Sequence, residues 1–159
     1  MSGEGDRQRI LFVCTGNTCR SPMAEGIATH LARELNLSSL EFRSAGISAY
    51  PGAPASRHAV AVAQSHGIDL GLHGASPLSS GLVGWADLVV CMTPEHLRAA
   101  GEVDPGGDMV LLTELLPASD PRHGIPVPDP FGGNIGAYSE TFDMLYATLS
   151  GHLQGRAEG

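Results

Sequence analysis

The chain has 159 residues, of which 42% are hydrophobic and 16% charged, and its formal net charge is −8. A sequence of this length has room for one substantial core, so residues 1–159 are predicted to form a single domain. The acidic balance, with no basic stripe, argues against nucleic acid as a partner.

The two ends of the chain are polar or rich in glycine, so residues 1–8 and 155–159 are expected to be flexible. The N-terminal residues lack the apolar core of a signal peptide, and no run of about 18 apolar residues occurs. The three cysteines fit a reducing compartment better than a disulfide scaffold. The sequence therefore predicts a cytoplasmic protein with no membrane association.

Between these ends, strand-like and helix-like segments alternate. Apolar runs such as Ile10–Val13 and Leu88–Val90 are typical of buried parallel strands. The predicted strands are 10–14, 41–46, 87–92 and 109–113, and the predicted helices are 22–36, 55–66, 94–100 and 134–153. The last helix carries an apolar stripe of Ile135, Tyr138, Phe142, Leu145, Leu149 and Leu153. This alternation predicts an α/β fold with a central, mostly parallel sheet of about four strands flanked by helices.

The run CTGNTCRSP, from Cys14 to Pro22, lies between the first predicted strand and the first predicted helix. A helix N-terminus offers unpaired N–H groups and a partial positive charge, and a turn of successive amides before it forms a concave anion site. Gly16 and Asn17 are residue types that tolerate the unusual φ angles of such a turn. The run therefore predicts a phosphate-binding loop at the carboxyl end of a strand, where α/β folds bind ligands.

Two side chains in this loop bring reactive chemistry. The Arg20 guanidinium can hold two phosphate oxygens at once, and the positive field of the loop favours the nucleophilic thiolate form of Cys14, to which Ser21 can donate a hydrogen bond. A buried structural cysteine and a chance match are the alternatives. Cys14 and Cys19 lack a second Cys or His pair at zinc spacing, so neither a metal nor a cofactor is expected.

Asp129 is the candidate proton donor for a leaving group. It lies in Val127-Pro-Asp-Pro130, where the flanking prolines restrict the backbone and can hold the carboxyl in place at low entropic cost. An ordinary Asp-Pro turn is the alternative from the residues alone. Asp120, which also precedes a proline, is interpreted as a turn residue.

The loop sequence resembles the signature of the low molecular weight protein tyrosine phosphatase family. Further segments follow in the family's order, namely Phe42–Gly46, Gly67–Leu70, Ala86–Val90 and Pro128–Phe131. The resemblance implies two displacements: Cys14 attacks phosphorus while Asp129 protonates the leaving group, and water activated by Asp129 then hydrolyses the cysteinyl phosphate. The loop residues Thr15, Gly16, Asn17, Thr18, Cys19, Arg20 and Ser21 would bind the phosphate, with Ser44 and His73 supporting the loop through a buried polar network.

The substrate depends on a few positions. Thr18 replaces the bulky aliphatic residue of many tyrosine-type members, and Phe131 is followed by two glycines rather than by a second aromatic residue. Both features resemble the bacterial protein arginine phosphatase branch, while Tyr50 lies where tyrosine-type members often place an aromatic wall. We therefore expect a phosphatase of phosphoarginine or phosphotyrosine in proteins, with phosphoarginine favoured and a strict tyrosine phosphatase as the alternative.

Other readings of the chain remain open. Cys19 could form a disulfide with Cys14 and protect it from over-oxidation, as in family members, or it could simply pack in the loop. An arsenate reductase would need further relay cysteines, and the remaining Cys91 lies in an apolar strand typical of a core. A phosphocarrier would need neither Arg20 nor Asp129. The predicted partners are phosphorylated proteins, and the enzyme is expected to be a monomer.

Overall fold

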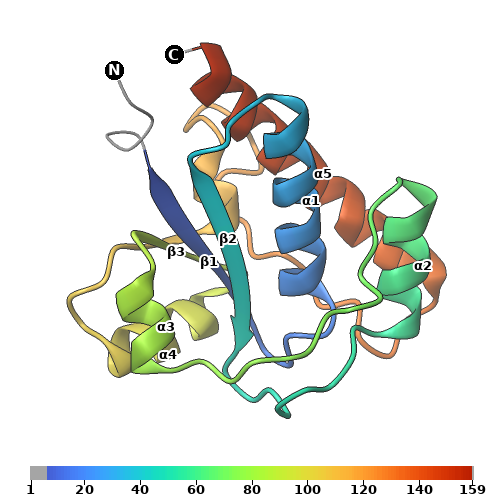
Figure 1. Cartoon of the computed structure of the whole chain (residues 1–159), viewed down its shortest axis with the longest axis horizontal. Helices are drawn as coiled ribbons and strands as arrows, with labels where there is room; N and C mark the ends of the chain where they lie inside the picture. The colour runs from blue at the N-terminus through green and yellow to red at the C-terminus, as the bar shows by residue number, and fades with distance from the viewer. Residues whose placement is uncertain (1–6, 159) are drawn as a thin grey trace.

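The computed structural model describes residues 7–158 (Figure 1). Its centre is a four-stranded sheet with the order β2-β1-β3-β4, in which every neighbouring pair is parallel. The strands are β1 (Gln8–Cys14), β2 (Leu40–Gly46), β3 (Leu88–Cys91) and β4 (Met109–Leu111). The predicted α/β fold with a parallel sheet of about four strands is confirmed.

Helices cover both faces of this sheet. They are α1 (Arg20–Glu34), α2 (Arg57–Ser65), α3 (Ser80–Trp85), α4 (Pro94–Val103) and α5 (Ile135–Glu158), with a 3₁₀ turn, η2 (Leu112–Leu115). Because side chains alternate along β1, Ile10 and Phe12 pack in the core under α1, α2 and α5, whereas Leu11 and Val13 pack in the core under α3 and α4. Figure 1 shows these two groups of helices on opposite sides of the strands.

Several boundaries differ from the sequence-based prediction. The six-residue helix α3 was not expected, because fewer than two turns are too short for a periodic apolar pattern. Regular structure also extends further toward both ends, since Gln8 belongs to β1 and residues 155–158 belong to α5, where flexible ends were predicted. Ile135 was assigned to the buried stripe of α5 but is half exposed, because it is the first residue of that helix. The expectation of flexibility at 1–6 and 159 lies outside the described residues.

The chain order creates a crevice at one end of the sheet. From β1 the chain crosses to β2 on one side, and it later returns to form β3 on the other side of β1. Such a switch point separates the loops that follow neighbouring parallel strands and is the usual ligand site of this architecture. The 15–19 loop lies there. Within residues 7–158, none of the helices combines the length and apolar character that a membrane span requires.

Candidate active site

The loop after β1 ends at the N-terminus of α1. Cys14 is the last residue of the strand, and Cys19 is the N-cap of the helix, with no side-chain hydrogen bond capping the helix. The amides of this first turn are therefore free of a side-chain partner that would compete with an anion. Asn17 has a φ of 56°, as predicted for this loop, whereas Gly16 is not in the positive-φ region, so that part of the prediction is wrong.

Gly46, at the end of β2, lies directly against this loop. A Cβ atom at residue 46 would lie 2.5 Å from the carbonyl oxygen of Thr15 and 2.8 Å from the amide nitrogen of Asn17. The backbone around Gly46 also binds the loop, because Ile47 N donates to Cys14 O and Ser48 N donates to Thr15 O. Only glycine permits this close approach, which fixes the base of the loop.

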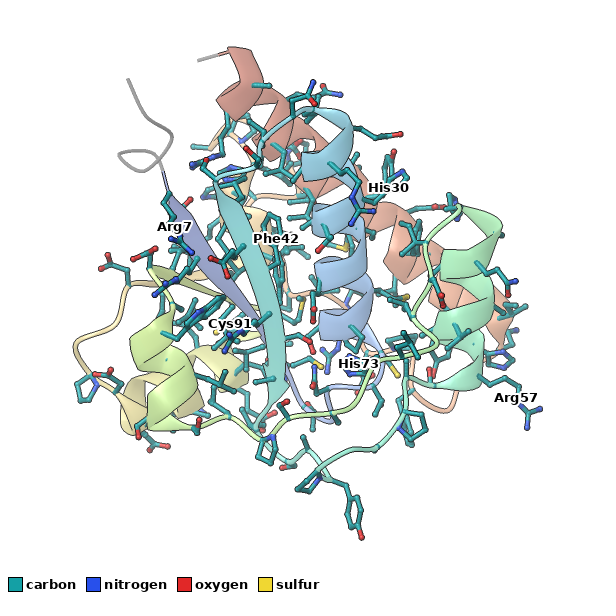
Figure 2. All side chains as sticks on the ribbon, in the orientation of Figure 1. Arg7, His30, Phe42, Arg57, His73 and Cys91 are labelled. Atoms are coloured by element: carbon teal, nitrogen blue, oxygen red, sulfur yellow. The ribbon has the colours of Figure 1, made fainter. Side chains whose placement is uncertain are left out.

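The side chain of Asn17 holds the loop from inside. It is fully buried, and its Nδ2 donates to Ser21 Oγ at 2.8 Å and to Ser44 Oγ at 2.9 Å. Its Oδ1 accepts a hydrogen bond from the backbone N–H of Ser76 at 2.8 Å. His73 Nε2 donates to the Asn17 carbonyl at 2.7 Å, and Figure 2 shows His73 beside the base of α1. The structure thus brings the two predicted support residues, Ser44 and His73, into one network with Asn17 and Ser21, and it adds the Ser76 amide.

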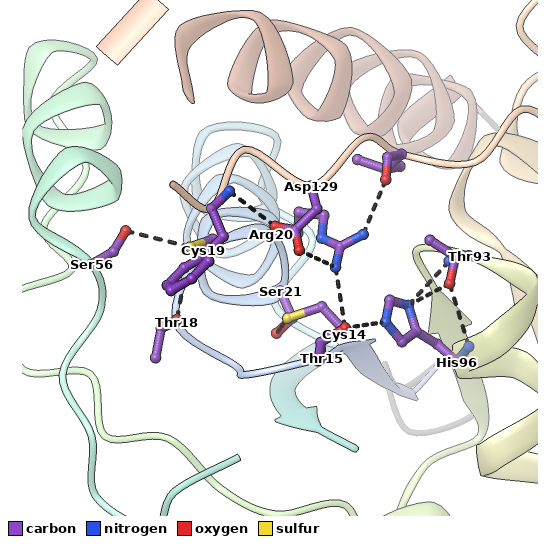
Figure 3. A network of polar contacts seen from close by, with 12 residues as sticks. Cys14, Thr15, Thr18, Cys19, Arg20, Ser21, Ser56, Thr93, His96 and Asp129 are labelled. Carbon is purple, nitrogen blue, oxygen red and sulfur yellow. Dashed lines mark hydrogen bonds and ion pairs between the residues drawn. The ribbon is translucent and has the colours of Figure 1, made fainter. Parts of the chain in front are cut away.

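The thiol of Cys14 is nearly inaccessible to solvent, and its Sγ lies 2.9 Å from Ser21 Oγ. Because Asn17 donates to Ser21 Oγ, the serine can direct its own proton to the sulfur. A hydrogen bond donated to sulfur stabilises the thiolate over the thiol. The chain of hydrogen bonds from Asn17 through Ser21 to Cys14 is therefore arranged to favour a nucleophile at Cys14. Figure 3 shows Ser21 beside the Cys14 sulfur.

Arg20 is 4% exposed and held by three contacts. Its Nη1 donates to the carbonyl of Val127 at 3.1 Å, and its Nη2 lies 3.3 Å from Thr15 Oγ1 and 3.4 Å from Asp129 Oδ2. Its buried Nε has no hydrogen-bond partner among the described residues. A buried guanidinium N–H without a partner is costly unless a ligand satisfies it, so Arg20 is poised to bind an anion.

A pocket of about 170 Å³ opens over the loop. It is lined by Cys14, Thr15, Gly16, Thr18, Cys19, Arg20, Asp129 and Phe131. Asp129 reaches it from the loop after η2, which is tied to the end of β3 because Val127 N donates to the carbonyl of Met92. The half-exposed carboxyl accepts a hydrogen bond from Phe131 N at 3.0 Å. The nucleophile, cation and acid candidates therefore meet in one cavity.

The three residues assigned to substrate selection differ in position. Thr18 lines the pocket, and Phe131 also lines it with a ring that is 75% exposed. Tyr50 is 79% exposed and is not among the residues that line the pocket, so the aromatic wall expected at this position stays a prediction. The chain turns sharply here, with Ala53 N donating to Tyr50 O and Gly52 at a φ of 82°, a geometry typical of a type II turn.

The remaining cysteines lie in different surroundings. Cys19 is buried beside α5, with its Sγ 3.3 Å from Tyr138 Oη and 3.5 Å from Ser56 Oγ. Cys91 packs in the core under α3 and α4, where burial raises the pKa of its thiol to about 12, and this agrees with the expected structural role (Figure 2). All three cysteines are free thiols. Across residues 7–158, no three His, Cys, Asp or Glu side chains gather as a metal site would require.

Comparison with known proteins shows which family this chain is similar to. The family model described as low molecular weight phosphotyrosine protein phosphatase matches residues 9–157. The chain belongs to this family. A protein-arginine-phosphatase of Bacillus subtilis is 44% identical over 142 residues, covering 88% of this chain and 91% of the relative. A low molecular weight protein-tyrosine-phosphatase of Streptomyces coelicolor is 35% identical over 150 residues, covering 91% of each.

Solved structures of the family give the same result. The crystal structure of a mutant of YwlE from Bacillus subtilis superimposes with a TM-score of 0.85 at 38% identity, covering 96% of this chain and 99% of that one. This low molecular weight phosphatase therefore has the same fold as that structure over nearly its whole length.

One residue of the site was missed in the sequence. His96 is 1% exposed, and its Nε2 lies 2.9 Å from Thr15 Oγ1. It belongs to the first turn of α4, in which Thr93 is the N-cap and His96 Nδ1 accepts a hydrogen bond from the N-cap amide. The sequence had indicated that this helix starts at Thr93-Pro94. A histidine three residues after that N-cap could therefore have been recognised as a capping residue of α4.

Proposed function

We propose that this protein is a cysteine-dependent phosphatase that hydrolyses phosphoarginine in proteins. The observation that carries the proposal is the pocket where the Cys14 thiol, the unpartnered Nε of buried Arg20 and the Asp129 carboxyl meet. The similarity to a protein-arginine-phosphatase over most of both chains supports the choice of substrate.

The reaction would run in two displacements. The Cys14 thiolate attacks phosphorus and forms an S–P bond, while the bond from phosphorus to the leaving nitrogen breaks and Asp129 gives that nitrogen its proton. Asp129, now a carboxylate, takes a proton from water, whose oxygen attacks phosphorus and releases the Cys14 thiolate. Arg20 and the loop amides would bind the phosphoryl oxygens throughout both steps.

Thr18 supports phosphoarginine over larger aromatic esters. Phosphoarginine presents a planar, polar guanidino group next to the phosphate, and a small hydroxylated side chain in the pocket wall leaves room and a hydrogen-bonding group for it. A bulky aliphatic residue at this position would offer neither. Phosphotyrosine is the second candidate, because the exposed Phe131 ring at the pocket could stack on an aromatic substrate.

The test compares two peptides that differ only in the phosphorylated residue. For the wild type we expect a higher kcat/KM with phosphoarginine than with phosphotyrosine. Thr18→Ile should shift the ratio toward phosphotyrosine, Thr18→Val separates the loss of the hydroxyl from the change in volume, and Cys14→Ser should abolish turnover. An unchanged ratio in Thr18→Ile would refute the role of this residue, and turnover by Cys14→Ser would refute the mechanism.

We further propose that the enzyme acts as a monomer on phosphorylated proteins of the cytoplasm. The three free thiols fit a reducing compartment. Light scattering at micromolar concentration should give the mass of one chain, and a dimer would contradict the proposal. Fractionation of the producing cell should recover the protein with the soluble cytoplasmic enzymes.

Reversible oxidation is also proposed for the two cysteines of the pocket. A peroxide would oxidise the Cys14 thiolate to a sulfenic acid, and attack by the Cys19 thiol would form the disulfide and release water. Both residues line the same pocket, which supports the pairing. After peroxide treatment, non-reducing peptide mapping should find Cys14 joined to Cys19 and buried Cys91 unmodified. A free Cys19 beside a sulfinic Cys14 would contradict the proposal.

A further inference from the structure

The imidazole of His96 has a defined tautomer. The backbone N–H of Thr93 donates to His96 Nδ1 at 3.1 Å, and an amide N–H can only donate, so Nδ1 carries no proton. Burial and the nearby Arg20 charge lower the pKa of His96 to about 4, with Asp129 opposing them, so the ring is neutral at neutral pH. The single ring proton is therefore on Nε2, which donates to Thr15 Oγ1 at 2.9 Å.

This donor determines the direction of the Thr15 hydroxyl. Thr15 Oγ1 accepts one hydrogen bond from His96 Nε2 and a second from Arg20 Nη2 at 3.3 Å. Both neighbours can only donate, so the proton of the hydroxyl must point elsewhere. Thr15 and Cys14 both line the pocket. Figure 3 shows Thr15 between the His96 ring and the Arg20 guanidinium, next to Cys14.

We propose that His96 is a positioning residue for the phosphatase reaction, which acts through Thr15 by turning the Thr15 hydroxyl proton toward a phosphoryl oxygen in the pocket. The inference rests on the proposed function. A hydroxyl that accepts from two donors, one of them charged, is a stronger donor itself, since chained hydrogen bonds polarise one another.

The same contact also anchors Arg20. Thr15 Oγ1 is one of the acceptors that hold Nη2, while Val127 O holds Nη1, so the unpartnered Nε is left for the ligand. A neutral imidazole suits this place, because an imidazolium would face the Arg20 cation. Without the hydrogen bond from His96, the Thr15 side chain could rotate away from Arg20. The guanidinium would then lose Thr15 Oγ1 as a fixed acceptor.

Two substitutions separate this role from a structural one. In His96→Asn the amide oxygen can occupy the place of Nδ1 and keep the bond from the Thr93 amide, but no group reaches Thr15. In His96→Gln the amide nitrogen can occupy the place of Nε2 and keep the donor to Thr15, and a glutamine at this position of a capping box can also accept from the Thr93 amide. We therefore expect both variants to keep the cap and similar stability, whereas phosphate binding should be weakened only where the donor to Thr15 is lost.

The probe is inorganic phosphate as a competitive inhibitor of 4-nitrophenyl phosphate hydrolysis, with stability measured by denaturant unfolding. His96→Asn should raise the inhibition constant about tenfold, the effect of one hydrogen bond, whereas His96→Gln should stay near the wild type, and the two variants should unfold at similar denaturant concentrations. Thr15→Val should match His96→Asn, and the double variant Thr15→Val, His96→Asn should be no worse than Thr15→Val alone. Ser79→Ala, which removes the N-cap of α3, controls for loss of a cap alone.

The outcomes distinguish two failures. If phosphate does not inhibit the wild type, or the wild type does not hydrolyse the ester, the proposed function fails. If the wild type binds phosphate and the two His96 variants lose binding in proportion to their stability, or if the effects at positions 15 and 96 simply multiply, the positioning role is overturned.

Discussion

The carbonyl oxygen of Thr15 lies 2.5 Å from the position that a Cβ atom on Gly46 would take, which is too close for any side chain at that position. Thr15, the first residue of the 15–19 loop, and Gly46, the last residue of β2, are thereby packed backbone against backbone. The 15–19 loop cannot move toward β2, and no residue larger than glycine fits at position 46.

Gly46→Ala tests this contact. The added methyl group must displace backbone rather than a flexible side chain, so we expect a loss of about 1–3 kcal/mol in the free energy of unfolding together with a large loss of activity. The matched control is Gly101→Ala, at a helical site where, apart from its own helix backbone and chain neighbours, no atom of the described residues lies within 4 Å of a new Cβ. That substitution should stabilise α4 by about 0.5–1 kcal/mol and leave activity unchanged. Equal behaviour of the two variants would contradict this account.

Asn17 offers a second test through two substitutions. Both Asn17→Gly and Asn17→Ala remove the bonds to Ser21, Ser44 and the Ser76 amide, so each should lower the free energy of unfolding by about 2–4 kcal/mol. Alanine should cost about 1 kcal/mol more, because φ is 56° at this position. Asn36→Gly is the control, since exposed Asn36 has a φ of 58° and should tolerate glycine. Urea unfolding measures all three.

Arg20→Lys should lower kcat/KM by about 10²–10³-fold. A lysine has one nitrogen and cannot contact Val127 O, Thr15 and a phosphoryl oxygen together, as the guanidinium is placed to do. Arg122→Lys is the control, because the exposed Arg122 side chain pairs with no residue but Asp120 in the described part of the chain and should be replaceable without loss of activity. If Arg20→Lys retained wild-type kcat/KM, the planar guanidinium of Arg20 would not be required for the reaction, which would contradict this prediction.

The pH dependence of stability should report His96. Its pKa is about 4 in the fold against 6.5 ordinarily, so between these values the unfolded chain binds the proton and the folded chain does not. The free energy of unfolding should therefore fall by up to about 3 kcal/mol as the pH drops from 6.5 to 4. His152, whose pKa burial also lowers, adds a smaller fall of the same sign. His96→Asn should show a shallower slope, and an unchanged slope would contradict the assignment.

The hydrophobic pattern was enough to predict the architecture. Continuous apolar runs such as Ile10–Val13 are typical of strands covered on both faces, and the stripe through Phe142 is typical of a helix packed on a core. The loop between the first strand and helix then followed from topology. Cys14, Arg20 and Asp129 were singled out by their chemistry and by family resemblance, and the structure brings them into one pocket.

Contacts between segments that are distant in the sequence could not be predicted from it. His96 and Thr15 are in contact although 81 residues separate them in the sequence. No local sequence pattern shows that α4, rather than another helix, packs against the 15–19 loop. Tyr50 was expected at the pocket, but the turn at Gly52 directs the chain so that this ring is exposed. The tight approach of Gly46 likewise depends on the register of β2 beside β1, in which Gly46 pairs with Cys14.

The most direct test of the mechanism is to trap its intermediate. In Asp129→Ala, 4-nitrophenyl phosphate can still phosphorylate the enzyme, because its leaving group departs without a proton, but no base activates water for the second step. Rapid acid quench and peptide mass spectrometry should find one phosphoryl group on Cys14, with a burst of nitrophenolate equal to the enzyme concentration. A phosphoryl group on another residue, or full turnover by Cys14→Ser, would contradict the account.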